Sequence, residues 1–323
     1  MTDLPTPATP GTDSRLIRRA LQAGILGSAL AEQALVLLRE GGDGCAFLVA
    51  QGALTASQVE LLRGGSGGDA LDGLGEFVLR EVIGKGGMGV VYRAVQSSLQ
   101  REVALKVLAG SLADDPLFRE RFIREAKVAA SISSSHVVTC YAAGSDQHRL
   151  YLAMELMPGG DVERLVLQQA GTLPEAKALA IARDAALGLE AIHQAGLVHR
   201  DIKPANLLLD RDGRAKIGDL GLTRPPHASG VTGPGAVPGT PSFMAPEQIC
   251  NDPTLDARAD IYALGATLFF LLTGRPPFTG SSHYAVVHQA VNESIPDPRL
   301  TRPGISAAAA AIVVRAGARD RTQ

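Results

Sequence analysis

The chain has 323 residues, of which 46% are hydrophobic and 20% are charged, and its 31 basic and 33 acidic residues give a net charge of -2. This composition is typical of a globular protein with a substantial core. The near-neutral charge argues against a general affinity for nucleic acid or for anionic membranes. The length exceeds that of one small domain and suits a two-lobed domain with an appended segment.

The first 75 residues carry no catalytic pattern. Residues 1–13 are rich in Pro and Thr, lack the apolar core of a signal peptide and predict a disordered tail. Residues 14–63 have apolar side chains at helical spacing, interrupted by glycines, and predict a small bundle of three or four helices. The pattern fits a module that binds a regulatory partner as well as one that only packs. Residues 64–75, GGSGGDALDGLG, predict a flexible linker.

The cysteines and the apolar runs bear on location. Cys45, Cys140 and Cys250 are widely separated and show no metal-ligand spacing, which favours a reducing, cytoplasmic setting. The longest apolar run, residues 262–272, is far shorter than the about 20 residues that cross a bilayer. No membrane segment is therefore predicted within the chain, and an anchor beyond residue 323 stays open.

From residue 76 onward the pattern predicts two lobes. Alternating apolar residues and a glycine-rich turn predict an antiparallel sheet with one helix, residues 118–131, and the predicted strands are 77–82, 90–95, 102–108, 137–141 and 150–155. Beyond Gly160 the pattern is mainly helical and begins with a helix over 175–194. We therefore expect an α+β domain with an N-terminal lobe at 76–156 and a C-terminal lobe at 157–323.

The glycine-rich turn reads GKGGMG and includes Gly84, Lys85, Gly86 and Gly89. GxGxxG alone is weak evidence, because dinucleotide-binding folds and other loops also contain it. In a dinucleotide fold the turn opens a helix, whereas the β-branched residues that follow here extend a strand. No GK[ST] ends the turn, so it is not a P-loop. A turn of glycines between two strands lets the backbone approach a ligand closely, as a flap over phosphates must.

Lys106 interrupts an otherwise apolar predicted strand, VALKVL. In the helix that follows, Glu125 shares a face with Phe118, Phe122 and Ala129, so its carboxylate should point toward the interior. A buried carboxylate must be paired or neutralised. The pattern therefore predicts an ion pair between Lys106 and Glu125.

Residues 199–221, HRDIKPANLLLDRDGRAKIGDLG, place Asp201, Lys203, Asn206 and Asp219 where phosphoryl transfer needs a proton acceptor, a cation and metal ligands. The stretch resembles the catalytic loop and metal-binding motif of eukaryotic-type serine/threonine protein kinases, most closely the bacterial members, with DLG where DFG is usual. The likeness runs from about residue 77 to the C-terminus. It implies the two-lobed protein-kinase-like fold and transfer of the γ-phosphate of Mg-ATP to serine and threonine hydroxyls of proteins.

The resemblance also implies roles for single residues. Asp201 would accept the hydroxyl proton, Lys203 would steady the phosphoryl group, and Asn206 and Asp219 would bind Mg²⁺. The Lys106–Glu125 pair would position the α- and β-phosphates of ATP. By the same likeness, the glycine-rich turn would cover the phosphates, and Asp161 would bond the ribose. The backbone of Glu155 and Met157 would bond adenine. The faces of the purine would be contacted by Val91, Ala104 and Leu208.

Residues 239–247, GTPSFMAPE, resemble the substrate-docking end of a kinase activation segment. By that likeness Thr240 bonds the catalytic aspartate and lysine, and Arg200 grips a phosphate on the segment. Thr232, with Ser229 as a second candidate, is the predicted autophosphorylation site, and a homodimer that phosphorylates in trans is left open. Ala205 replaces the glutamate with which some relatives recognise basic substrates, so a basic consensus is not expected.

Two acidic residues complete the expectations. Asp260 lies in a helix that is apolar nearly all round, and the resemblance makes it an anchor for the catalytic-loop backbone.

Glu247 pairs with a later arginine in the family, and Arg319 or Arg321 of RAGARDRTQ would have to serve here. Without such a partner the C-terminal lobe is weakened or the sequence is a fragment. This departure is the one feature that favours a pseudokinase scaffold, whereas the complete GTPSFMAPE segment argues against a small-molecule phosphotransferase.

Overall fold

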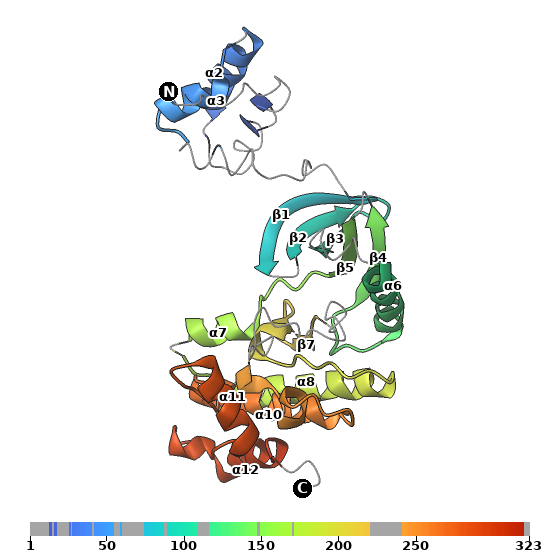
Figure 1. Cartoon of the computed structure of the whole chain (residues 1–323), viewed down its shortest axis with the longest axis vertical. Coiled ribbons are helices and arrows are strands. Elements are labelled where there is room, and N and C mark those ends of the chain that lie inside the picture. Colours follow the sequence, from blue (N-terminus) through green and yellow to red (C-terminus); the bar gives the residue numbers. More distant parts are fainter. Residues whose placement is uncertain are drawn as a thin grey trace. The chain divides into compact units, whose positions relative to one another are not determined.

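The computed structural model describes residues 13–14, 16–17, 26, 28–40, 42–54, 59, 74–86, 89–108, 116–146, 149–169, 171–219 and 241–319. The chain forms two compact units, Met1–Gly73 and Leu74–Gln323 (Figure 1).

The first unit contains the helices α2 (Ser28–Arg39) and α3 (Gly44–Ala50), with further helical residues at 13–14, 16–17 and 59. Ala31 and Ala34 of α2 pack with Leu48 of α3 in one buried cluster. These residues agree with the helical bundle predicted over 14–63. The predicted linker from residue 64 to residue 73 lies outside the described residues.

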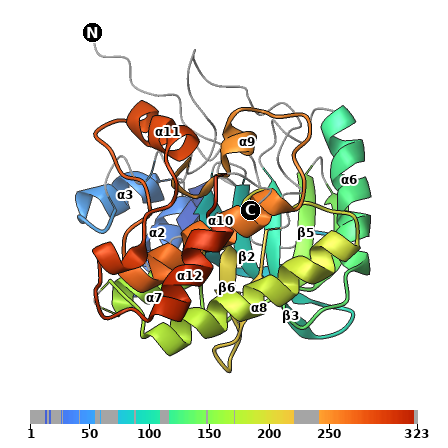
Figure 2. The same ribbon diagram turned by 90° about the horizontal axis from the view of Figure 1, so that it is seen from below.

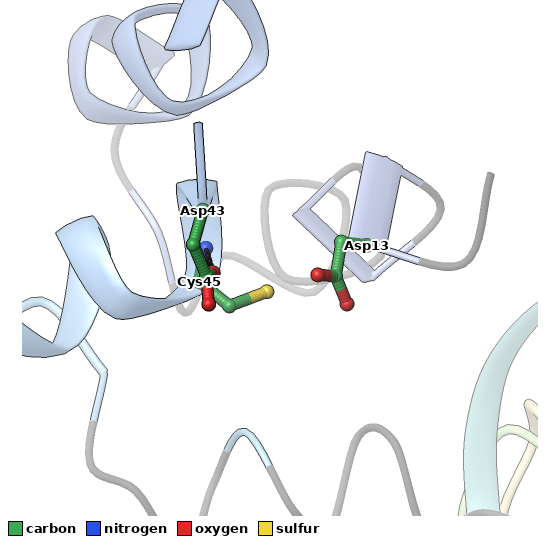
Figure 3. Close-up of side chains that lie close together, drawn as sticks. All are labelled: Asp13, Asp43 and Cys45. Carbon is green, nitrogen blue, oxygen red and sulfur yellow. Dashed lines mark hydrogen bonds between the residues drawn. The ribbon is translucent and has the colours of Figure 1, made fainter. Parts of the chain in front are cut away.

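Asp13, Asp43 and Cys45 come together at the start of α3, with one potential metal-ligand atom from each lying within 4.8 Å of the others (Figure 3). The Oδ1 atom of Asp43 accepts hydrogen bonds from the backbone N–H groups of Cys45 (3.0 Å) and Ala46 (2.9 Å). Asp43 is therefore the N-cap of α3, a common structural role for aspartate. We assign this cluster to the packing of the helix start.

The N-terminal lobe of the second unit is a five-stranded antiparallel sheet in the order β1-β2-β3-β5-β4. Its strands are β1 (Phe77–Gly86), β2 (Gly89–Gln96), β3 (Arg101–Leu108), β4 (Cys140–Asp146) and β5 (Arg149–Glu155). The helix α6 (Pro116–Ser131) packs beside β4 through a buried face that includes Phe118, Phe122 and Ala129 (Figure 1).

One predicted strand begins later along the chain than expected. A strand was expected over 137–141, but β4 begins at Cys140, and Val137 instead forms a parallel bridge with Ile217 of the C-terminal lobe. The backbone explains the shift, because Ile217 N donates to His136 O (2.9 Å) and Val138 N donates to Ile217 O (2.8 Å). The residues just before β4 are thus bonded to the C-terminal lobe instead of to the sheet.

The C-terminal lobe is mainly helical and carries a two-stranded ribbon. Its elements are α7 (Val162–Gln168), α8 (Glu175–Gln194), η1 (Pro204–Asn206), β6 (Leu207–Leu209), β7 (Ala215–Ile217), η2 (Pro241–Phe243), α9 (Pro246–Ile249), α10 (Arg258–Thr273), α11 (His283–Asn292), η3 (Pro298–Leu300) and α12 (Ala307–Ala316). The helix α10 is buried along nearly its whole length and packs against α8 and α12, as Figure 2 shows from below.

The predicted two-lobed α+β architecture is confirmed, and α8 has the bounds expected from the sequence. The apolar run at 262–272 lies within α10, in the main hydrophobic core of this lobe. Among the described residues, no helix combines the length and apolar character needed to cross a membrane.

Candidate active site

The sheet presents three of the predicted site side chains, Val91, Ala104 and Lys106, on one face together with Met154. Val91 is paired with Lys106 across β2 and β3, and Ala104 is paired with Met154 across β3 and β5. Directly opposed residues of an antiparallel pair share a face, as do residues two apart in a strand. Lys106 fixes which face this is, because its Nζ lies 2.6 Å from Oδ1 of Asp219 in the C-terminal lobe. The face therefore looks toward the loop that follows β7.

The glycine-rich turn joins two strands, as predicted. Gly86 of β1 is paired with Gly89 of β2, and residues 87 and 88 lie outside the described residues. Gly89 has a φ of 147°, and a Cβ atom there would lie 2.1 Å from Val107 O, so only glycine fits. Strand pairing on both sides of the turn excludes the strand-to-helix turn of a dinucleotide fold. Lys85 is exposed beside it.

The predicted pair between Lys106 and Glu125 is not what the structure shows. Lys106 bonds Asp219, while Oε1 of Glu125 lies 3.8 Å from Nε of Arg121, one turn earlier in α6. Burial raises the pKa of Glu125, and the nearby positive charges of Arg121, Arg124 and Arg200 oppose that shift. Glu125 is half-buried in α6, and a cation four residues away on the same helix can reach its carboxylate.

The catalytic loop brings together three of the predicted residues. The Oδ2 atom of Asp201 accepts from Nζ of Lys203 (3.0 Å) and from Nδ2 of Asn206 (2.9 Å). The same Nδ2 donates to the backbone oxygen of Asp201 (2.7 Å). Because the amide nitrogen of Asn206 is used within the loop, its Oδ1 atom is the one left to bind a cation.

His199 joins this loop to the segment that carries Asp219. Its Nδ1 accepts from the backbone N–H of Asp201 (3.2 Å), so Nε2 carries the proton and donates to Gly218 O (2.9 Å). Gly218 N also donates to Asn206 O (2.9 Å). The residue before Asp219 is thus bonded to the catalytic loop twice. His199 was not among the site residues predicted from the sequence, although its place two residues before Asp201 was a signal.

Asp260 anchors the catalytic-loop backbone, which confirms the expectation for this residue. Its side chain is fully buried and accepts from His199 N (2.8 Å), Arg200 N (2.7 Å) and His193 Nε2 (2.8 Å). Arg200 O accepts a further bond from Nε2 of Gln248 (2.8 Å). Arg200 has a φ of 65°, a left-handed conformation that persists where surrounding bonds enforce it.

The segment between the lobes is bonded to the ribbon β6–β7. Gly159 N donates to Leu209 O (3.0 Å), and Leu209 N donates to Gly160 O (2.8 Å). Asp161 forms an isolated bridge with Leu208, and its Oδ1 accepts from Arg164 N (2.7 Å) as the N-cap of α7. The predicted purine contact Leu208 and the predicted ribose contact Asp161 are therefore neighbours. Met157, which lies between β5 and Asp161 along the chain, is half-buried.

The sequence matches the protein kinase domain over residues 77–309. The chain belongs to the protein kinase family. It is 37% identical over 229 residues to the serine/threonine-protein kinase PknL of Mycobacterium tuberculosis, covering 71% of the chain and 57% of that protein. It is 40% identical over 250 residues to PknJ of Mycobacterium bovis, covering 76% of the chain and 42% of that protein. The chain thus spans roughly half the length of these relatives.

A solved structure gives the same fold. The crystal structure of the PknI kinase domain of Mycobacterium tuberculosis is similar with a TM-score of 0.61 and 29% sequence identity. The match covers 77% of this chain and 91% of that domain. The likeness therefore includes both lobes of the kinase domain.

One family feature is different in this kinase domain. Glu247 is half-buried and forms no ion pair within the part of the chain that the structure describes, and Nη1 of Arg319 instead donates to Asn292 O (3.4 Å). Arg319 is therefore not the substitute partner, while Arg321 lies outside the described residues.

Burial, and then the negative charge of Glu247, raise the pKa of Tyr262. Thr240, Thr232 and Ser229 also lie outside the described residues.

Proposed function

We propose that the chain is a serine/threonine protein kinase that transfers the γ-phosphate of Mg-ATP to serine and threonine hydroxyls of proteins. The observation that carries the proposal is that hydrogen bonds connect the lysine of the sheet, through the segment of Asp219, with the catalytic loop. Lys106 of the sheet bonds Asp219 at 2.6 Å, and Gly218, next to Asp219, bonds the loop that holds Asp201, Lys203 and Asn206. The names of the relatives PknL and PknJ support the same reaction.

The donor set fits magnesium. Oδ1 of Asn206 and Oδ2 of Asp219 are oxygen ligands, which Mg²⁺ prefers when it also contacts phosphates. A magnesium ion held by these two residues would supply positive charge to offset that of the phosphates. Lys106 lies beside Asp219 and would contact the α- and β-phosphates. We assign Glu125 as the partner that Lys106 takes when Asp219 turns to the metal.

Asp201 is the proposed proton acceptor for the substrate hydroxyl. Its carboxylate receives hydrogen bonds from Lys203 and Asn206, which fix its orientation. Lys203, beside Asp201, would offset the charge of the transferred phosphoryl group. Thr240 completes this proposed set through the family likeness.

The nucleotide is proposed to lie against the face of the sheet that carries Lys106. Val91 and Ala104 belong to that face, and Leu208 would contact the purine from the other lobe. The backbone of Glu155 and Met157 would bond adenine, and Asp161 would bond the ribose. The turn with Gly84, Lys85, Gly86 and Gly89 would cover the phosphates.

Regulation and surroundings are further parts of the proposal. Autophosphorylation of Thr232, with Ser229 as a second acceptor, would supply a phosphate for Arg200, and a homodimer would allow this in trans. The helical unit before residue 64 is proposed to bind a regulatory partner. None of the three cysteines forms a disulfide within the described residues, which suits a cytoplasmic, reducing setting.

The test is transfer of label from γ-labelled ATP to the purified chain and to a mixed protein substrate. We expect label on serine and threonine with Mg²⁺, loss of transfer on chelation by EDTA, and recovery with excess Mg²⁺, because Asn206 and Asp219 need the cation to hold the phosphates. Phosphopeptide mapping should place label between residues 222 and 240. Binding of ATP without transfer would instead indicate a pseudokinase, and label confined to small molecules would contradict protein kinase activity.

A further inference from the structure

An ion pair joins the end of β5 to the ribbon of the other lobe. Nζ of Lys216 in β7 lies 2.7 Å from Oε1 of Glu155, and the two side chains are 15% and 23% exposed. Oε2 of Glu155 also accepts from the backbone N–H of Thr139 (3.3 Å), and Glu155 N donates to Thr139 O (2.9 Å). Both oxygens of this carboxylate are therefore engaged, and a pair this far out of solvent is more sensitive to loss of one partner than a surface pair.

The two ends of the interlobe segment are fixed by different means. At residues 159–161 the segment is bonded to β6 through backbone groups, which no side-chain substitution removes. At Glu155 the contact with the ribbon is the side-chain pair with Lys216. The contact of Glu155 with the ribbon thus depends on one lysine, while its backbone is also held by Thr139 and by pairing with Val103 of β3.

The place of Lys216 links this backbone to the metal-binding end of the site. In β7 the flanking residues Ala215 and Ile217 are buried, while Lys216 is half-buried and turned the other way. Lys216 is paired with Leu208 across the ribbon, so both side chains share one face. Asp219 follows Lys216 by three residues. The Lys216–Glu155 pair therefore connects two parts of the site. One is the strand β7, which leads to Asp219, and the other is the segment proposed to bond adenine.

We propose that Lys216 is a positioning residue for nucleotide binding, which orients the backbone from Glu155 to Met157 toward the adenine base through its ion pair with Glu155. The inference rests on the proposed function, because it takes the base to bond this backbone. Lys216 acts through Glu155 and touches neither the phosphates nor the transferred group. Its loss should weaken recognition of the base and leave recognition of the phosphates intact.

The experiment compares two probes by calorimetry on the full chain: adenosine, which has no phosphates, and magnesium tripolyphosphate, which has no base. Lys216→Met should bind adenosine about three- to tenfold more weakly and tripolyphosphate as the parent does, because only the base uses this backbone. Glu155→Gln should reproduce the loss, and Lys216→Arg should restore part of it. In the transfer assay the KM for ATP should rise more than kcat falls.

The matched control is Arg214→Met, two residues away in the same ribbon, where Arg214 makes a 3.8 Å pair with Asp212 and both side chains are about 70% exposed. It should leave both affinities unchanged. Equal adenosine affinity in the parent and Lys216→Met would overturn the inference while leaving the proposed function standing. An equal loss for both probes would indicate general loosening and also overturn it. If the parent binds no adenosine, the proposed function fails, and the inference fails with it.

Discussion

Replacing Asp201 by asparagine should lower phosphoryl transfer by about a hundredfold to ten-thousandfold, the range for removal of a positioned general base. The substitution keeps the shape of the side chain but removes its charge and one hydrogen-bond acceptor. In the parent, a single oxygen, Oδ2, accepts from both Lys203 and Asn206. An amide can present an oxygen to these two donors, but it cannot take up the proton of the substrate hydroxyl.

The effect should appear in the rate of transfer and not in the affinity for adenosine, since Asp201 lies in the catalytic loop and the proposed adenine contacts lie in the segment between the lobes. Single-turnover transfer and adenosine calorimetry measure the two quantities separately. Asp212→Asn is the control, because that carboxylate is 71% exposed in the β6–β7 turn and should leave both unchanged. A turnover close to that of the parent in Asp201→Asn would refute the assignment of the proton acceptor.

The sequence was most informative where chemistry is contained in a short segment. Asp201, Lys203 and Asn206 fall within six residues, and the turns of one loop are enough to bring their side chains together. The antiparallel sheet was also predictable, because period-two patterning and turn residues are local signals. The burial of Asp260 was predicted from its apolar helix, which again needs only local sequence, while its role as an anchor came from the family resemblance.

Pairings between distant elements were not predictable in the same way. The choice of Lys106 between Glu125 and Asp219 depends on how α6 and the loop after β7 lie against the sheet, which periodicity within either segment does not determine. Lys216 was missed for the same reason, since its partner Glu155 is 61 residues away. A lone lysine between two buried apolar residues of a short strand was the only local signal.

Replacing Asp260 by alanine should destabilise the kinase domain by about 3–5 kcal/mol, the cost of removing one partner from a buried charged network. The carboxylate is fully buried and is the acceptor for the backbone N–H groups of His199 and Arg200. Without it both groups lose their acceptor, which costs about 1–3 kcal/mol for a buried donor such as His199 N. The measurement is urea unfolding followed by a probe confined to the C-terminal lobe, because a chain with two compact units need not unfold in one step.

Asp260→Asn tests the same role in a variant with a smaller expected loss. Its single oxygen can replace Oδ2, which accepts from His199 N and His193 Nε2, but its amide group then faces Arg200 N. We therefore expect a loss of about 1–3 kcal/mol, faster hydrogen exchange at the Arg200 amide, and lower kcat because the loop that carries Asp201 is less well positioned. Asp256→Asn, at an exposed pair with Arg258, should leave the stability nearly unchanged. Unchanged exchange at Arg200 in Asp260→Asn would show that the loop keeps its conformation without this anchor.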